Sequence, residues 1–298
     1  MTQSMGHQAR FAVDAATPFD GLSEWIDIKS ENLQKKAVIL DTDTVMGTRS
    51  HIEERTRAGV QDISGTINMI ASPALLDNWL PRILGGAESV DSFPLAETLP
   101  EFAALIDRVA DVYLYEHLKV NKATFRGTTG SNFVELDIDV VGKTETKGQT
   151  WPAALTTAGL DIAANNAPYV FTDGVLTLQA GAREFTEFEL AIDNKLNVDF
   201  RNSVTATDID AGDREVTLTV KVPAISGNAD LYDQALAGAA GTLVFTNGTY
   251  STTFTFGTLQ VPSQSPVIEG KGPILHTLTM IARKTGSTDE LVVTNVTA

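Results

Sequence analysis

The sequence predicts a mainly β chain with short helices, an α+β fold in which one predominantly β unit occurs twice in tandem. Three observations lead to this expectation. Several segments alternate apolar and polar residues with the period of a half-buried strand. One of these strands runs directly into a helix-start signal. The same order of elements then returns in the second half of the chain, as expected for an internal repeat.

The first predicted strands follow a polar N-terminal segment. Apolar Trp25, Ile26 and Ile28 lead toward a short apolar run at residues 37–40, a pattern that predicts strand, turn and strand. Residues 42–59 are polar and lack a sustained period, so they predict a long surface loop. From residue 62 the sequence alternates and predicts a strand with these residues on one face: Ile63, Gly65, Ile67 and Met69.

A short helix is predicted directly after this strand. Ser72 is a favourable N-cap, and Pro73 fits the first helical position. Apolar residues then recur at helical spacing: Leu75, Leu76, Trp79, Leu80, Ile83 and Leu84. Gly85 and Gly86 predict the end of the helix. Pro81 removes a backbone donor, so we expect a kink there or an early end.

Further strands are predicted at residues 112–120 and in the alternating segment at residues 133–140. Residues 143–168 are rich in Thr, Gly, Ala and Asn, which is typical of a linker. We therefore predict two units, a first at residues 1–155 with its N-terminal arm and a second at residues 156–298.

The second half repeats the order of the first. A strand with apolar Phe185, Phe188, Leu190 and Ile192 is followed by a polar stretch at residues 202–213. An alternating strand then ends at Pro223, and residues 231–242 align without a gap with the predicted helix and glycine at residues 75–86. Two more strands follow, and they align Leu118 and Val120 with Leu259 and Val261.

This pattern resembles the major tail tube proteins of long-tailed, siphovirus-type bacteriophages, and the resemblance covers both halves. It is carried by DISGTINMI running into SPALLDNWLPRILGG, by REVTLTVKV running into ADLYDQALAG, by FELAIDNKL and by the closing GKGPILHTLTMIARKTGSTDELVVTNV. The resemblance implies that each unit is a β-sandwich flanked by a helix. It also implies that the inner sheets of several units close into a β-barrel ring and that rings stack into a hollow tube for DNA.

The resemblance also implies a symmetry and a set of partners. Two units per chain predict that three chains close a ring with pseudo-sixfold symmetry, and we prefer this trimer to a hexamer. The chain would then bind itself in rings stacked head to tail, and it would contact other tail proteins such as the tape measure and the tail terminator. DNA would pass through without specific binding. The expected location is the virion tail, assembled in the host bacterial cytoplasm, without a membrane.

Two groups of residues are candidates for these contacts. An acidic lumen avoids binding DNA in transit, and one strand carries acidic residues at alternating positions that are candidates for a luminal face: Glu135, Asp137 and Asp139. A solvated outer face is the alternative for them. The polar loops correspond in place to family loops that reach the neighbouring ring, and their charged residues are candidates for intersubunit ion pairs: Arg49, Glu53, Glu54, Arg55, Arg57, Asp208, Asp210 and Asp213. Ordinary surface loops are the alternative.

The composition excludes several other classes of function. Lys and Arg number 22 against 38 Asp and Glu, and the net charge of −16 repels phosphate, which argues against tight binding to DNA or to an anionic membrane. The acidity is equally consistent with a role in solubility alone. There is no cysteine, so disulfides and thiolate chemistry are excluded, in keeping with a reducing compartment. The N-terminal residues lack the pattern of a signal peptide.

No residue pattern predicts catalysis, a cofactor or a metal. The histidines are scattered without a ligand pair: His7, His51, His117 and His276. Residues 127–130 (GTTG) are not followed by Lys-Ser or Lys-Thr and predict a turn, not a phosphate loop. We therefore predict a structural protein and not an enzyme. The alternative function is a soluble carbohydrate- or receptor-binding β module, although Trp25, Trp79 and Trp151 do not cluster in the sequence.

Overall fold

The computed structural model describes residues 4–15, 17, 19, 24–42, 44, 49–130, 133–153, 155, 166–179, 181–225, 238–260, 267–268 and 270–297. The described chain is mainly β, as the sequence predicts, and carries a single α-helix in this part. No helix among the described residues is long and apolar enough to span a membrane.

The elements of the first half, in chain order, are η1 (Gly6–Gln8), β1 (Arg10–Asp14), β2 (Glu24–Ile26), β3 (Ser30–Glu31), β4 (Gln34–Leu40), η2 (Glu53–Arg55), β5 (Arg57–Ile70), α1 (Pro73–Leu84), β6 (Ser92–Phe93), β7 (Phe102–Asp107), β8 (Val112–Thr128), β9 (Glu135–Gly142) and β10 (Thr144–Lys147). Those of the second half are η5 (Phe171–Asp173), β11 (Gly174–Leu178), β12 (Gly181–Arg183), β13 (Glu187–Asp193), β14 (Asn197–Asp199), β15 (Asp208–Asp210), β16 (Glu215–Pro223), β17 (Ala239–Asn247), β18 (Tyr250–Gln260), β19 (Leu275–Arg283) and β20 (Leu291–Val296).

A long antiparallel sheet, the central sheet, runs through both halves. Its strand order is β3 and β4, then β5, β9, β8, β13, β16 and β19. The halves meet where the C-terminal part of β8 pairs with β13, from Lys122 opposite Asp193 to Thr128 opposite Glu187. Side chains alternate between core and surface on these strands, as the sequence predicts for β5, β9, β13 and β16.

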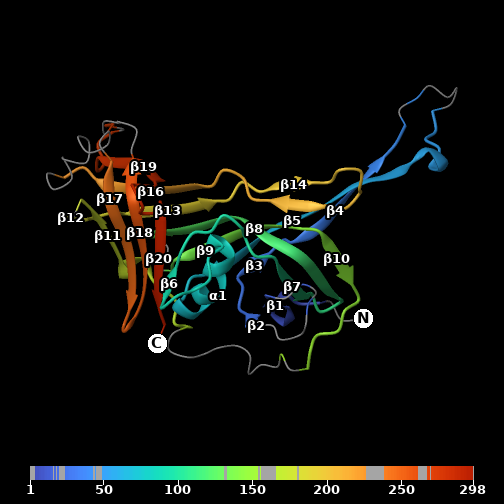
Figure 1. Ribbon diagram of the computed structural model, residues 1–298, viewed down its shortest axis with the longest axis horizontal. Coiled ribbons are helices and arrows are strands. Elements are labelled where there is room, and N and C mark those ends of the chain that lie inside the picture. The colour runs from blue at the N-terminus through green and yellow to red at the C-terminus, as the bar shows by residue number, and fades with distance from the viewer. Residues whose placement is uncertain are drawn as a thin grey trace.

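Two outer sheets pack against the central sheet, one in each half. The first has the order β2, β1, β7, β8, β10, and the second has the order β12, β11, β17, β18, β20, β6. The outer sheets lie toward opposite ends of the molecule, and the central strands run between them (Figure 1). Strand β8 belongs to both layers, because its start pairs in the outer sheet and its end pairs in the central one.

The same set of strand pairings occurs once in each half. Pairs β4–β5, β5–β9, β8–β9, β7–β8, β1–β7 and β1–β2 have the counterparts β13–β16, β16–β19, β18–β19, β17–β18, β11–β17 and β11–β12. The match extends to a register shift, which follows Phe102 in β7 and Ala239 in β17. Leu118 lies opposite Phe102, and Leu259 lies opposite Ala239.

The helix α1 begins where the sequence predicts and fills the space between the layers. Ser72 accepts a hydrogen bond from the Leu75 amide, and Gly85 ends the helix with φ 85°. Trp79 is fully buried, with its ring 5.6 Å from that of Phe102. The expectation of an early end at Pro81 is wrong, because the helix continues to Leu84 and its buried face holds the last turn in place.

Two further expectations need correction. The predicted linker at residues 143–168 contains strand β10, which pairs with the start of β8 and so extends the first outer sheet. The segment predicted as a second helix with its terminal glycine, residues 231–242, is not helical over its last four residues, because residues 239–242 belong to β17 and pair with β18. The rest of that predicted helix, residues 231–237, lies outside the described residues.

Candidate functional site

The surface side of the central sheet, here called the polar face, carries the acidic residues of β9. Glu135, Asp137 and Asp139 all lie on it, because they alternate with buried neighbours along the strand. The sequence predicted this shared face correctly. All three are half-buried rather than freely exposed, which points to partners on adjacent strands.

Each of these carboxylates is bonded across the sheet. Glu135 forms ion pairs with Lys29 and Arg126, and Asp137 pairs with Arg126 as well. Asp139 accepts a hydrogen bond of 2.6 Å from the Thr66 hydroxyl. The hydrogen bond from Lys29, together with the positive charges nearby, holds the pKa of Glu135 below its ordinary value. The polar face is thus an ionic network and not a bare acidic stripe.

The network continues over the second half. Lys221 of β16 donates to Glu187 of β13 at 2.7 Å, and Lys195 donates to Glu215 at 2.6 Å. The bases Lys29 and Arg126 were missed at the level of sequence. Only the register of β8 against β9 places Arg126 opposite Glu135, so no local signal could have found that pair.

The described residues in the range 37–61, here called the first arm, form the end of β4 and the start of β5 and project well beyond the body (Figure 1). The predicted loop at residues 42–59 is shorter than expected, since residues 57–59 already belong to β5 and residues 53–55 form η2. The predicted contact residues of this arm are all exposed: Arg49, Glu53, Glu54, Arg55 and Arg57. Residues 43 and 45–48 lie outside the described part.

The first arm also exposes large apolar side chains. Val38 is 52% exposed, Ile39 is 76% exposed and Leu40 is 54% exposed. Val60, on the paired strand, is 42% exposed. Every residue of β4 is exposed, and β4 pairs on one side with β5. An exposed apolar edge strand of this kind is normally covered by a partner.

Residues 194–214, here called the second arm, behave differently from the predicted loop at residues 202–213. Asp208 and Asp210 lie in strand β15, which pairs with β14, and Ile209 between them is fully buried. Asp213 is exposed in the segment before β16. The second arm lies beside the first arm where the first arm leaves the body (Figure 1). The structure therefore does not group the three aspartates with the described charged residues of the first arm.

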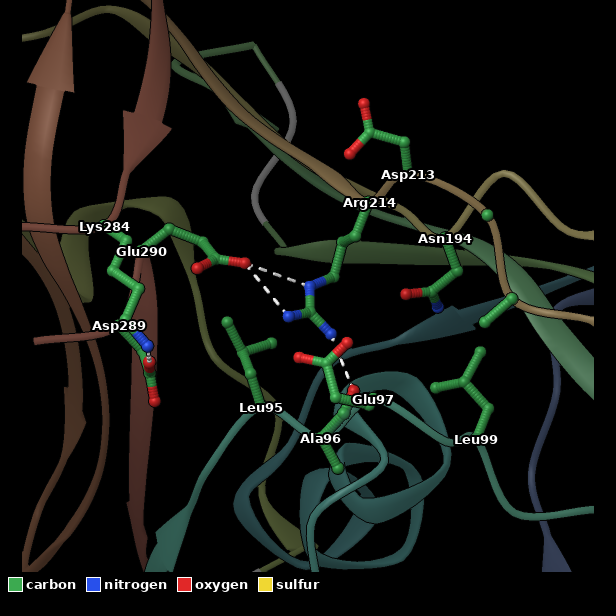
Figure 2. A pocket seen from close by; sticks show the side chains of 12 residues that line it. Leu95, Ala96, Glu97, Leu99, Asn194, Asp213, Arg214, Lys284, Asp289 and Glu290 are labelled. Atoms are coloured by element: carbon green, nitrogen blue, oxygen red, sulfur yellow. Dashed lines mark hydrogen bonds and ion pairs between the residues drawn. The ribbon is translucent and has the colours of Figure 1, made fainter. Parts of the chain in front are cut away.

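A polar pocket of about 260 Å³ lies between the halves, next to the second arm. Figure 2 shows Arg214 pointing between Glu290 and the backbone of Ala96. Arg214 donates to one carboxylate oxygen of Glu290 at 3.1 and 3.0 Å and to the Ala96 carbonyl at 2.9 Å. Because its guanidinium is bonded within the chain, Arg214 ties the first half to the second.

No group of three or more His, Asp or Glu side chains in the described residues is arranged to hold a metal ion. His117 contacts Glu101, at 2.6 Å, and Lys143 donates to the same carboxylate at 3.1 Å. Burial raises the pKa of Glu101, but these two hydrogen bonds outweigh it and lower the pKa below its ordinary value.

One aromatic contact was not visible in the sequence. The rings of Trp25 and Trp151 meet edge to face, with centroids 6.0 Å apart, and Arg10 lies over Trp151 at 4.5 Å. Arg10 also donates to Asp107 at 2.9 Å. These contacts bind the segment after β10 to the first outer sheet.

Comparison with known families agrees with the resemblance seen in the sequence. The sequence profile of the family described as phage tail tube protein matches residues 8–282. No curated protein matches the chain. The family match supports a structural role in the virion tail and gives no support to a sugar- or receptor-binding module. Since the match spans nearly all of a mainly β chain, the chain belongs to the phage tail tube protein family.

Proposed function

We propose that this chain is built from two tandem tube units, residues 1–155 and 156–298, and that three chains close each ring of a siphovirus-type tail tube. The observation that carries the proposal is the repetition of the strand pairings in the two halves. Each half supplies one set of neighbouring strands to the central sheet, so a chain fills two of six equivalent positions.

The junction between the halves supplies a template for the contact between chains. In the repeat, β4 occupies the place of β13, because β4 pairs with β5, which pairs on its other side with β9, just as β13 pairs with β16, which pairs on its other side with β19. Strand β13 is covered by β8, whereas the corresponding edge at residues 34–36 of β4, before the first arm begins, is exposed. We propose that the second half of a neighbouring chain covers this edge and closes the barrel.

The polar face is proposed to line the bore, because it is the surface side of the central sheet, and the central sheet is the one that would close into the barrel. Its acidic residues form ion pairs with Lys29, Arg126 and Lys221. Lys and Arg side chains that are already paired with carboxylates bind phosphate more weakly than unpaired ones. DNA would therefore pass through without specific binding. Glu135, Asp137 and Asp139 would be luminal in this arrangement.

Rings are proposed to stack head to tail through the first arm, with its exposed charges and apolar residues against the next ring. The ends of the tube would meet the tape measure and tail terminator proteins, and assembly would take place in the host bacterial cytoplasm. The family is structural, so no turnover of a substrate is assigned to the chain.

Native mass spectrometry and electron microscopy of the purified chain test this proposal. We expect trimeric rings with pseudo-sixfold class averages, and hollow tubes at high concentration. The variant Lys35→Pro, on the exposed edge at β4, should prevent ring closure. Because the Lys35 amide also donates to the Glu145 carboxylate within the chain at 3.1 Å, the control is Glu145→Ala, which removes that acceptor but leaves the β4 backbone intact and should still close rings. Rings of six chains would overturn the tandem arrangement, and persistent monomers would overturn the ring itself.

A further inference from the structure

We infer that the second arm is an internal strut that fixes the base of the first arm, so that each chain presents one stacking arm rather than two. The stacking role of the first arm rests on the proposed function, whereas the strut is a property of the single chain. It departs from the expectation that both polar loops reach a neighbouring ring.

The second arm is anchored in the core at its start. Asn194 is 2% exposed, and its side-chain amide donates to the carbonyls of Ile83 and Val120, each at 3.1 Å. The Leu196 amide donates to the Asn121 side chain at 2.9 Å. The helix α1 and the middle of β8 therefore fix the direction in which the arm leaves the body.

The second arm is anchored again at its return strand. The carbonyl of fully buried Ile209 accepts a hydrogen bond of 2.7 Å from Lys119 of β8. Asp208 lies 3.9 Å from the ammonium of Lys143, which also donates to Glu101 at 3.1 Å. The first half of the chain thus holds the arm through buried and ionic contacts that a loop reserved for another ring would not need.

Between these anchors the second arm pairs with the base of the first arm. The Gln61 amide donates to the Val204 carbonyl at 2.7 Å, and Gln61 forms a parallel bridge with Thr205. Strand β9 covers β5 only from Ile63 onward, opposite Gly142. The second arm therefore occupies the edge of β5 just where β9 has ended and where the first arm leaves the body (Figure 1).

The two arms consequently have different roles. The described charged and apolar residues of the first arm are exposed, whereas the second arm contributes its backbone to the same chain. A ring of three chains would then carry three projecting arms, and ring-to-ring contacts would be threefold even where the barrel is pseudo-sixfold.

Hydrogen–deuterium exchange on the isolated chain tests the strut directly. Replacing residues 198–208 with a Gly-Ser linker should speed exchange of the Gln61 amide at least tenfold, while the Ile67 amide, in the paired interior of β5, keeps its rate. The milder double variant Lys119→Met, Lys143→Met should act in the same direction with the hairpin retained. Unchanged exchange at Gln61 in both variants would overturn the inference.

Tube formation separates a strut from a direct contact. Asp210→Lys and Asn202→Glu change exposed positions of the second arm and should leave tubes unchanged, whereas the linker variant should form rings that stack poorly. Loss of tubes with the two surface variants, at unchanged exchange, would assign the arm to the next ring instead. Since exchange is measured on the single chain, failure of the wild type to form trimers would contradict the proposed function and not the strut.

Discussion

Single residues decide how closely the strands of the first half approach one another. Gly65 of β5 is the clearest case, because a Cβ at this position would lie 2.4 Å from the Leu33 Cα. Gly127 of β8 is similar at the junction of the halves, where a Cβ would lie 2.7 Å from the Phe188 ring. Both glycines permit close contact between backbone and neighbour rather than unusual dihedral angles.

The substitution Gly65→Ala should therefore destabilise the chain. The clash is with backbone atoms of residues 32 and 33, so β3 and β4 must shift away from β5, at a cost of roughly 1–3 kcal/mol. Urea denaturation followed by circular dichroism measures the change. Gly130→Ala is the matched control, because no atom lies within 4 Å of a Cβ there. Equal stability of the two variants would contradict the packing described.

The ion pair of Glu135 predicts a pH dependence of stability. Its folded-state pKa lies below the ordinary value of 4.5, so the contribution to stability is present above pH 4.5 and is lost as the pH falls through the folded-state value. Because the site is partly exposed, we expect Glu135→Gln to cost at most about 1 kcal/mol at pH 7. The difference from wild type should shrink as the pH falls below 4.5 in urea titrations. A difference that grows on acidification would refute this assignment.

Elements of the chain divide into those whose ends are set locally and those set by contacts far away. The helix α1 belongs to the first kind, with Ser72 at one end and Gly85 at the other. Strand β8 belongs to the second kind, since it runs for 17 residues through two sheets. His117, at φ 56°, lies near the point where β8 leaves the outer sheet for the central one.

Removing the cap of α1 should weaken the whole chain, because the helix packs against both halves. We expect Ser72→Ala to lower the free energy of unfolding by about 1 kcal/mol, within the 0.5–2 kcal/mol usual for a lost N-cap. Ser72→Thr retains a hydroxyl and should recover most of the loss. Thermal denaturation of the three proteins provides the comparison, and an equal loss in both variants would show that the cap is not the cause.

The first arm should affect assembly without affecting folding. Ile39 is 76% exposed, so Ile39→Asp should change the free energy of unfolding by no more than about 0.5 kcal/mol. The same variant should reduce tube formation in negative-stain images, because the carboxylate cannot be covered by an apolar partner. Normal tubes from Ile39→Asp would remove the apolar residues of the first arm from the stacking contact.

At the scale of the whole molecule, the sequence predicted what depends on local period and missed what depends on distant register. The alternation in β5, β9, β13 and β16 and the caps of α1 are local, and these predictions are confirmed. The strand β10 was missed, because the polar residues 144–147 form a strand only by pairing with β8. The cations Lys29 and Arg126 were missed for the same reason, as was the inward packing of Ile209 in a polar stretch.

The pairing of β8 with β13 has a consequence for the rate at which rings appear. That junction is present in every folded chain, so half of the contacts of a six-position ring would need no encounter between molecules. Only three separate chains then lose translational and rotational freedom when a ring closes. A ring of six one-unit chains would require six molecules to lose that freedom. If three chains close each ring, as proposed, the yield of rings should rise with about the third power of the chain concentration, and a tube would begin to grow at a lower concentration than six separate units would need.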